Sequence, residues 1–147
     1  MKRFTLFFMA LMACIMASAQ SGLPDFSTED SPLYYSVKFK TGGNYLADKG
    51  AGKKMQTVAS ESDATNFQFI GTQASFIMKS KSGNYVGFSG ERFITTTKAN
   101  AVKMAIINGS ASKYYELKRA SQSKCMNQWA GTSAGVELGE WNAADGN

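Results

Sequence analysis

Histidine is absent from the 147-residue chain, and cysteine is scarce. The lack of histidine excludes histidine-based catalytic triads, the commonest general base and most zinc sites. Two cysteines cannot build a disulfide scaffold or a four-cysteine metal site. We therefore expect no cofactor and no metal, and the length fits a single domain.

Proline is also rare, with two residues against fourteen glycines, and only 18% of residues are charged. Frequent glycine, aromatic and β-branched residues favour short strands joined by tight turns. The apolar fraction of 44% is too high for a disordered chain. The net charge of +5 comes from scattered lysines without a dense basic run, so we expect no nucleic-acid partner.

The first twenty residues have the pattern of a secretory signal peptide. A basic start at Lys2 and Arg3 precedes an apolar run at 4–16 and the small residues Ala17 and Ala19. The apolar run is shorter than the roughly 20 residues that span a bilayer. We expect a signal peptide over 1–20, a mature chain that begins at Gln20 or Ser21, export to the periplasm, cell surface or medium, and membrane contact only during export.

A lipoprotein signal is the alternative interpretation of the same segment. The box Leu11-Met12-Ala13-Cys14 resembles a lipid-attachment site at Cys14. Met12 is bulky for that motif and the apolar run continues past Cys14, which favours soluble export. Export with cleavage after residue 19 leaves Cys125 as the one cysteine, and we expect it to be a small buried apolar residue.

The remaining chain repeats itself at about forty residues. An aromatic-x-apolar-lysine segment occurs at 35–38, 76–79 and 115–118. A second short strand is predicted at 44–46, 84–86 and 124–126, a third at 54–58, 93–97 and 136–141, and a fourth at 66–70 and 103–107. This pattern predicts an all-β, closed, barrel-like domain of three four-stranded repeats over 34–147, after a flexible lead-in at 21–33.

The last repeat has only three of its four predicted strands. The third copy of the fourth strand would fall near residues 145–150, and the sequence ends at Asn147 on residues typical of a turn. We therefore expect the domain to be truncated before a twelfth strand.

Three repeats of four strands resemble a β-trefoil, and residues 124–147 are similar to one subdomain of the ricin-type lectins. Those subdomains carry a Cys-x-Asp, a later Gln-x-Trp and a closing Asn-Gln. Asn127 stands at the Asp position, Trp141 at the Trp position and Asn147 at the turn asparagine. The resemblance implies a carbohydrate-binding role.

The sequence departs from the lectin pattern at several positions. Gly139 replaces the glutamine, Asn127 replaces the aspartate, and Ala143 stands near where a second cysteine would bridge to Cys125. In the first two repeats the corresponding pairs are Ala47 with approximately Thr57, and Gly87 with approximately Thr96. Neither pair has the aromatic or the acid, so any sugar site should lie in the third repeat.

The candidate carbohydrate-binding residues are Asn127, Trp141, Asn147 and Trp129. A sugar site needs a flat aromatic surface for C–H faces and a few amide or carboxylate partners for hydroxyls. The alternative is that the tryptophans pack in the core or turns and the asparagines form turns. The six tyrosines fall at repeat-equivalent positions, where we expect them to pack.

These observations favour a non-catalytic, lectin-like carbohydrate-binding module of an exported protein, at the front of a longer glycan-active chain. The expected partner is a glycan or monosaccharide, and the expected state is a monomer or part of a multidomain chain. A structural or protein-interaction trefoil of the inhibitor type, without a sugar site, is the alternative. Catalysis by Glu137 and Glu140 is disfavoured because their spacing offers no acid–base pair.

Overall fold

The computed structural model describes residues 22–111 and 113–142. This part of the chain holds eleven short strands and two single-turn 3₁₀ helices. The strands are β1 (Tyr34–Tyr35), β2 (Tyr45–Ala47), β3 (Gln56–Val58), β4 (Phe67–Thr72), β5 (Ser75–Ser80), β6 (Tyr85–Ser89), β7 (Arg92–Thr96), β8 (Met104–Asn108), β9 (Tyr115–Arg119), β10 (Cys125–Gln128) and β11 (Leu138–Trp141). The 3₁₀ helices are η1 (Glu61–Asp63) and η2 (Lys98–Asn100). Each of the eleven strands coincides with a predicted strand to within a few residues.

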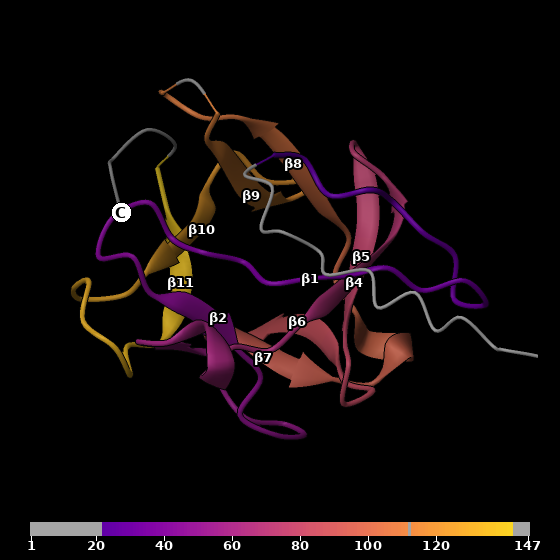
Figure 1. Ribbon diagram of the computed structural model, residues 1–147, viewed down its shortest axis with the longest axis horizontal. Coiled ribbons are helices and arrows are strands. Elements are labelled where there is room, and N and C mark those ends of the chain that lie inside the picture. Colours follow the sequence, from indigo (N-terminus) through magenta and orange to yellow (C-terminus); the bar gives the residue numbers. More distant parts are fainter. Residues whose placement is uncertain (1–21, 112, 143–147) are drawn as a thin grey trace, which may run out of the picture.

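The strands pair in antiparallel fashion along the path β1-β4-β5-β8-β9-β10-β11, with the β6–β7 hairpin joined to β5. The hairpin β2–β3 forms a separate two-stranded sheet. In Figure 1, β5, β8 and β9 lie in the upper part of the molecule and β2, β6 and β7 in the lower part. The sequence predicted that the third copy of the fourth strand is cut short near residue 147. Residues 143–147 lie outside the described residues, so this prediction is not tested.

Three of the hairpins carry corresponding residues in register. Tyr45 pairs with Val58 in β2–β3, Tyr85 with Thr96 in β6–β7, and Cys125 with Trp141 in β10–β11. Cys125 therefore stands where Tyr45 and Tyr85 stand, as the sequence predicted. The first-repeat counterpart of Trp141 is Val58, one residue beyond the predicted Thr57.

The ends of these hairpins meet over a shared apolar centre. Met55, Phe93 and Leu138 are fully buried, and backbone hydrogen bonds join Phe93 to Met55 and Met55 to Leu138. The N–H of Met55 donates to the carbonyl of Phe93 (2.9 Å), and the N–H of Leu138 donates to that of Met55 (3.2 Å). The strands β4, β5 and β8 add Phe67, Phe76, Met78 and Met104 to the same core.

A group of three charged residues precedes these apolar residues, one from each hairpin. Lys54, Arg92 and Glu137 stand immediately before Met55, Phe93 and Leu138, and we refer to them as the charge triad. Lys54 Nζ lies 2.9 Å from Glu137 Oε1, and Arg92 Nε lies 3.1 Å from Glu137 Oε2. One carboxylate thus binds two cations and joins the three hairpins through side chains.

The segment before β1 packs on the domain. Phe26 lies edge-on to Phe69 at 6.4 Å between ring centroids and contacts Phe76 at 5.4 Å. The N–H of Ser27 donates to the carbonyl of Phe69 (2.9 Å). Residues 22–33 therefore contact the barrel more closely than the predicted flexible lead-in would. Phe26 contributes to the difference because it removes apolar area from water when it docks, and Glu29 adds an ion pair with Lys98 at 2.7 Å.

Cys125 is buried with 5% of its surface exposed, as the sequence predicted. No helix within 22–111 and 113–142 is long and apolar enough to cross a membrane.

Candidate functional site

The β10–β11 hairpin brings three predicted site residues to one face. Successive side chains of a strand alternate between faces, so Asn127 and Trp129 point the same way. Asn127 pairs with Gly139 and Cys125 pairs with Trp141, which places Trp141 on this face as well. The N–H of Trp129 donates to the carbonyl of Glu137 (2.8 Å) and extends the hairpin by one pair.

The two tryptophans form a corner. Their ring centroids are 6.5 Å apart and their planes meet at 80°, an edge-to-face arrangement. Trp141 is half exposed, at 50% of its surface, whereas Asn127 is buried at 8%. An open hollow of about 480 Å³ lies against them, lined by Asn127, Gln128, Trp129, Ala130, Gly131 and Trp141. The fourth predicted site residue, Asn147, lies outside the described residues.

Trp129 is supported from two sides by residues that the sequence analysis did not assign to it. The guanidinium carbon of Arg92 lies 3.7 Å from the centroid of the Trp129 ring. A Cβ placed on Gly139 would overlap with Trp129 Cε3 and would lie 3.1 Å from Cζ3. The glycine that departs from the lectin pattern therefore makes room for the Trp129 ring.

The loop that follows Trp129 is anchored on the first repeat. Asn44 Nδ2 donates to the carbonyl of Thr132 (2.6 Å), and Thr57 Oγ1 donates to that of Ser133 (2.9 Å). Asn44 and Thr57 are both buried. Because these bonds cross from one repeat to another, the rim of the hollow is held by residues more than seventy positions away in the sequence.

Comparisons with known proteins bear on the fold. No family model and no curated protein sequence matches the chain. Among solved structures, the chain is similar to a ricin B-like lectin from Macrolepiota procera in complex with lactose. The TM-score is 0.68 at 15% sequence identity, over 84% of this chain and 93% of the lectin chain. The fold is a β-trefoil, the fold of that lectin. The predicted all-β fold class and lectin-like resemblance are confirmed at this level.

The other two hairpins of the trefoil lack an aromatic corner at the corresponding positions. Ala47 and Val58 take the places of Asn127 and Trp141 in β2–β3, and Gly87 and Thr96 take them in β6–β7. At Gly87 an added Cβ would lie 2.7 Å from Thr96 Cγ2, so that position is filled by its neighbour. The described hairpins therefore hold one tryptophan corner, in the third repeat.

The carboxylates near this corner are bound to cations. The hydrogen bond from Lys54, supported by one from Arg92, holds the pKa of Glu137 below its usual range. The carboxylate of Glu140 accepts a bidentate pair of hydrogen bonds from Arg119. Nε donates to Oε1 (2.6 Å) and Nη2 donates to Oε2 (2.7 Å). A glycosidase acid needs a raised pKa, whereas the pKa of Glu137 is lowered. This arrangement suits a structural role for both side chains.

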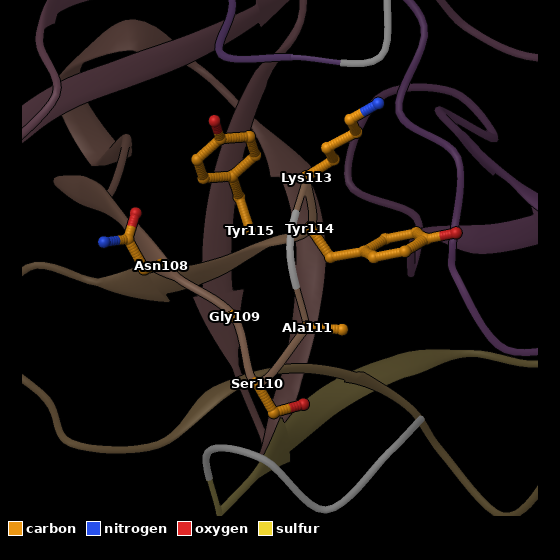
Figure 2. Close-up of a pocket in the computed structure, with 7 residues that line it drawn as sticks. All are labelled: Asn108, Gly109, Ser110, Ala111, Lys113, Tyr114 and Tyr115. Carbon is orange, nitrogen blue, oxygen red and sulfur yellow. The ribbon is translucent and has the colours of Figure 1, made fainter.

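A second hollow, of about 330 Å³, lies at the turn between β8 and β9. Figure 2 shows that the rings of Tyr114 and Tyr115 point in different directions, so they do not form one platform. Lys40 Nζ lies 5.1 Å from the centroid of the Tyr114 ring. Tyr114 and Tyr115 are 47% and 39% exposed, which contradicts the packed position predicted for them.

Within the described residues, no group of three or more His, Cys, Asp or Glu side chains could hold a metal ion.

Proposed function

We propose that the chain is a non-catalytic carbohydrate-binding module with one sugar site, built by the β10–β11 hairpin. The observation that carries the proposal is the corner of Trp129 and Trp141 over an open hollow, with Asn127 in its lining. The β-trefoil fold is shared with a solved lectin that binds lactose, which supports the same role.

The chemistry of the hollow suits a neutral sugar. The apolar C–H face of a pyranose can lie on one indole while its edge contacts the other, since the two rings are nearly perpendicular. Asn127 lines the hollow, and an amide group can pair with sugar hydroxyls as donor or as acceptor. The lining holds no charged side chain. A shallow site of this kind should bind with a Kd on the order of 0.1–10 mM.

A glycan array probed with the chain without residues 1–20 tests the proposal. Hits are then titrated against the unsubstituted chain and against Trp141→Ala. We expect one glycan class to bind and Trp141→Ala to lose it. The absence of any hit, or a hit whose affinity survives Trp141→Ala, would favour the structural trefoil instead.

We also propose that the module is exported without a lipid anchor. The basis is the basic start, the apolar run at 4–16 and the small residues before Gln20. Intact mass of the chain expressed with its own signal in a Gram-negative host tests this. We expect a mature species that begins at Gln20 or Ser21, whereas a diacylated species that begins at Cys14 contradicts it.

A protein-interaction trefoil is the second candidate, and the β8–β9 turn favours it. Exposed Tyr114 and Tyr115 flank a turn of small and polar residues. Tyrosine supplies large contact area at a low entropic cost, and serine and glycine adapt to a partner. If the array is empty, Tyr114→Ala and Tyr115→Ala should abolish capture of the physiological partner while Trp141→Ala does not.

A further inference from the structure

Arg92 reaches the candidate sugar site from a different hairpin. It begins β7, whereas the residues that line the hollow belong to β10, β11 and the loop between them. Its Nε donates to Glu137 Oε2 (3.1 Å) and its Nη1 donates to the carbonyl of Glu91 (3.1 Å). Only 15% of its side chain is exposed. The guanidinium is therefore held by two acceptors, the carboxylate of Glu137 just before β11 and the carbonyl of Glu91 in the turn between β6 and β7.

The fixed guanidinium lies on Trp129. At 3.7 Å from the ring centroid it is in stacking contact with the indole. Such a contact is favourable because the positive charge meets the negative face of the ring, and burial strengthens it. With Gly139 and Trp141 as further neighbours, the Trp129 ring has contacts on several sides. Its rotation is thus restricted before any ligand arrives.

We propose that Arg92 is a positioning residue of the sugar site, which presets the Trp129 ring without touching the ligand. A side chain that is already ordered loses less freedom on binding, and this raises affinity. The inference rests on the proposed carbohydrate-binding function. It adds that the second repeat contributes to a site whose ligand contacts come from the third.

The charge triad offers a matched control for Arg92. Lys54 donates to the same carboxylate, at 2.9 and 3.0 Å from the two oxygens of Glu137. Lys54→Met removes one cation from Glu137 and leaves the stacked guanidinium in place. Arg92→Lys keeps the charge, and a lysine can still pair with Glu137, but its ammonium lacks the flat face that stacks on indole.

The first experiment needs no ligand. The chain has two tryptophans, so Trp141→Phe leaves Trp129 as the single tryptophan, whose emission is excited selectively at the red edge of the absorption band, where the six tyrosines do not absorb. In this background we measure acrylamide quenching of Trp129, and thermal melting confirms that each variant is folded. Arg92→Lys should raise the quenching constant about twofold, because the ring gains freedom, and Lys54→Met should leave it unchanged. An unchanged quenching constant in Arg92→Lys would overturn the inference.

The second experiment titrates the sugar that the unsubstituted chain binds, lactose or the array hit, into chains that retain Trp141. Arg92→Lys should weaken binding of that sugar about fivefold, and Lys54→Met should change it by less than about twofold. Increased quenching with unchanged sugar affinity would overturn the inference, because Trp129 would then not act as a platform. If the unsubstituted chain binds neither lactose nor any array glycan, the proposed function fails, and with it the role in binding. The quenching result still reports whether Arg92 orders Trp129.

Discussion

The ring of Trp129 occupies the space that a side chain at Gly139 would fill. The two residues belong to opposite sides of the β10–β11 hairpin, and Gly139 pairs with Asn127. The glycine and the tryptophan thus form one packing unit, in which the absence of a side chain on β11 allows a large one next to β10. The partly buried Trp129 ring thus lies beside the half-exposed Trp141.

Gly139→Ala should therefore displace Trp129. The added methyl group overlaps with Cε3, and such overpacking costs about 1–3 kcal/mol of the free energy of unfolding. Chemical denaturation measures this loss. The matched control is the double variant Gly139→Ala with Trp129→Ala, in which the clash is removed. The interpretation fails if Gly139→Ala costs the same with and without the Trp129 ring.

Loss of the aromatic platform should weaken sugar binding. Trp141→Ala removes a half-exposed indole, and we expect the free energy of binding to fall by about 1–2 kcal/mol, or roughly 5- to 30-fold in Kd. Asn127→Ala should cost about 1–3 kcal/mol through lost hydrogen bonds. Calorimetric titration with the array hit measures both. Tyr85→Phe loses the bond to Glu29 (3.0 Å), and neither residue lines the hollow, so it should lower stability and leave the affinity unchanged.

Asp48 should make the fold sensitive to acid. Burial alone would raise its pKa, but hydrogen bonds from Asn84, Ser80, Ser82 and the N–H of Gly50 outweigh burial and lower it. The lengths to the carboxylate oxygens are 2.9, 2.7, 2.7 and 2.7 Å, respectively. A lowered pKa means that the carboxylate stabilises the folded state above the unfolded pKa of about 4, and that this contribution is lost as the pH falls through the folded pKa.

Asp48→Asn should cost about 1–3 kcal/mol of unfolding free energy at neutral pH. The difference from the unsubstituted chain should shrink below about pH 4, where the aspartate itself becomes protonated. Denaturation at a series of pH values measures this, with Asp30→Asn on the exposed surface as the control. A difference that stays constant down to pH 2 would contradict the role assigned to the charge.

The thiol of Cys125 should be unreactive in the folded protein. Burial, with Glu116 Oε2 3.2 Å from its Sγ, raises the pKa of Cys125 to about 12. The thiolate is the reactive form, and it is scarce at pH 8. In a Cys14→Ser background, a disulfide reagent should modify Cys125 promptly in denaturant and at least about a hundredfold more slowly without it. Prompt modification of the native protein would show that the thiol is accessible.

The fold was largely predictable because its strands recur at about forty residues with alternating apolar side chains. The equivalence of Cys125 with Tyr45 and Tyr85 also followed from that spacing. The first-repeat counterpart of Trp141 was misplaced by one residue because the hairpin loops differ in length. The paired residues are 13 positions apart in β2–β3, 11 in β6–β7 and 16 in β10–β11.

The grouping of Asn127, Trp129 and Trp141 was within reach of the sequence because one hairpin carries all three. Arg92 was not, because its position on Trp129 depends on how two hairpins meet, and no local pattern encodes that contact. The docking of Phe26 was also missed, because it is the one aromatic residue of a largely polar segment and its contact with Phe69 is set by the tertiary structure.

The charge triad limits how similar the three repeats of this sequence can be to one another. Its three residues occupy the same position of three hairpins, and their charged groups meet within 3.1 Å at one carboxylate. In a chain with three identical hairpins, whichever residue stood there would face two copies of itself. Three lysines or three glutamates would repel one another. A fully symmetric version of this protein must therefore place an uncharged residue at positions 54, 92 and 137, and in doing so it would lose the arginine that stacks on Trp129.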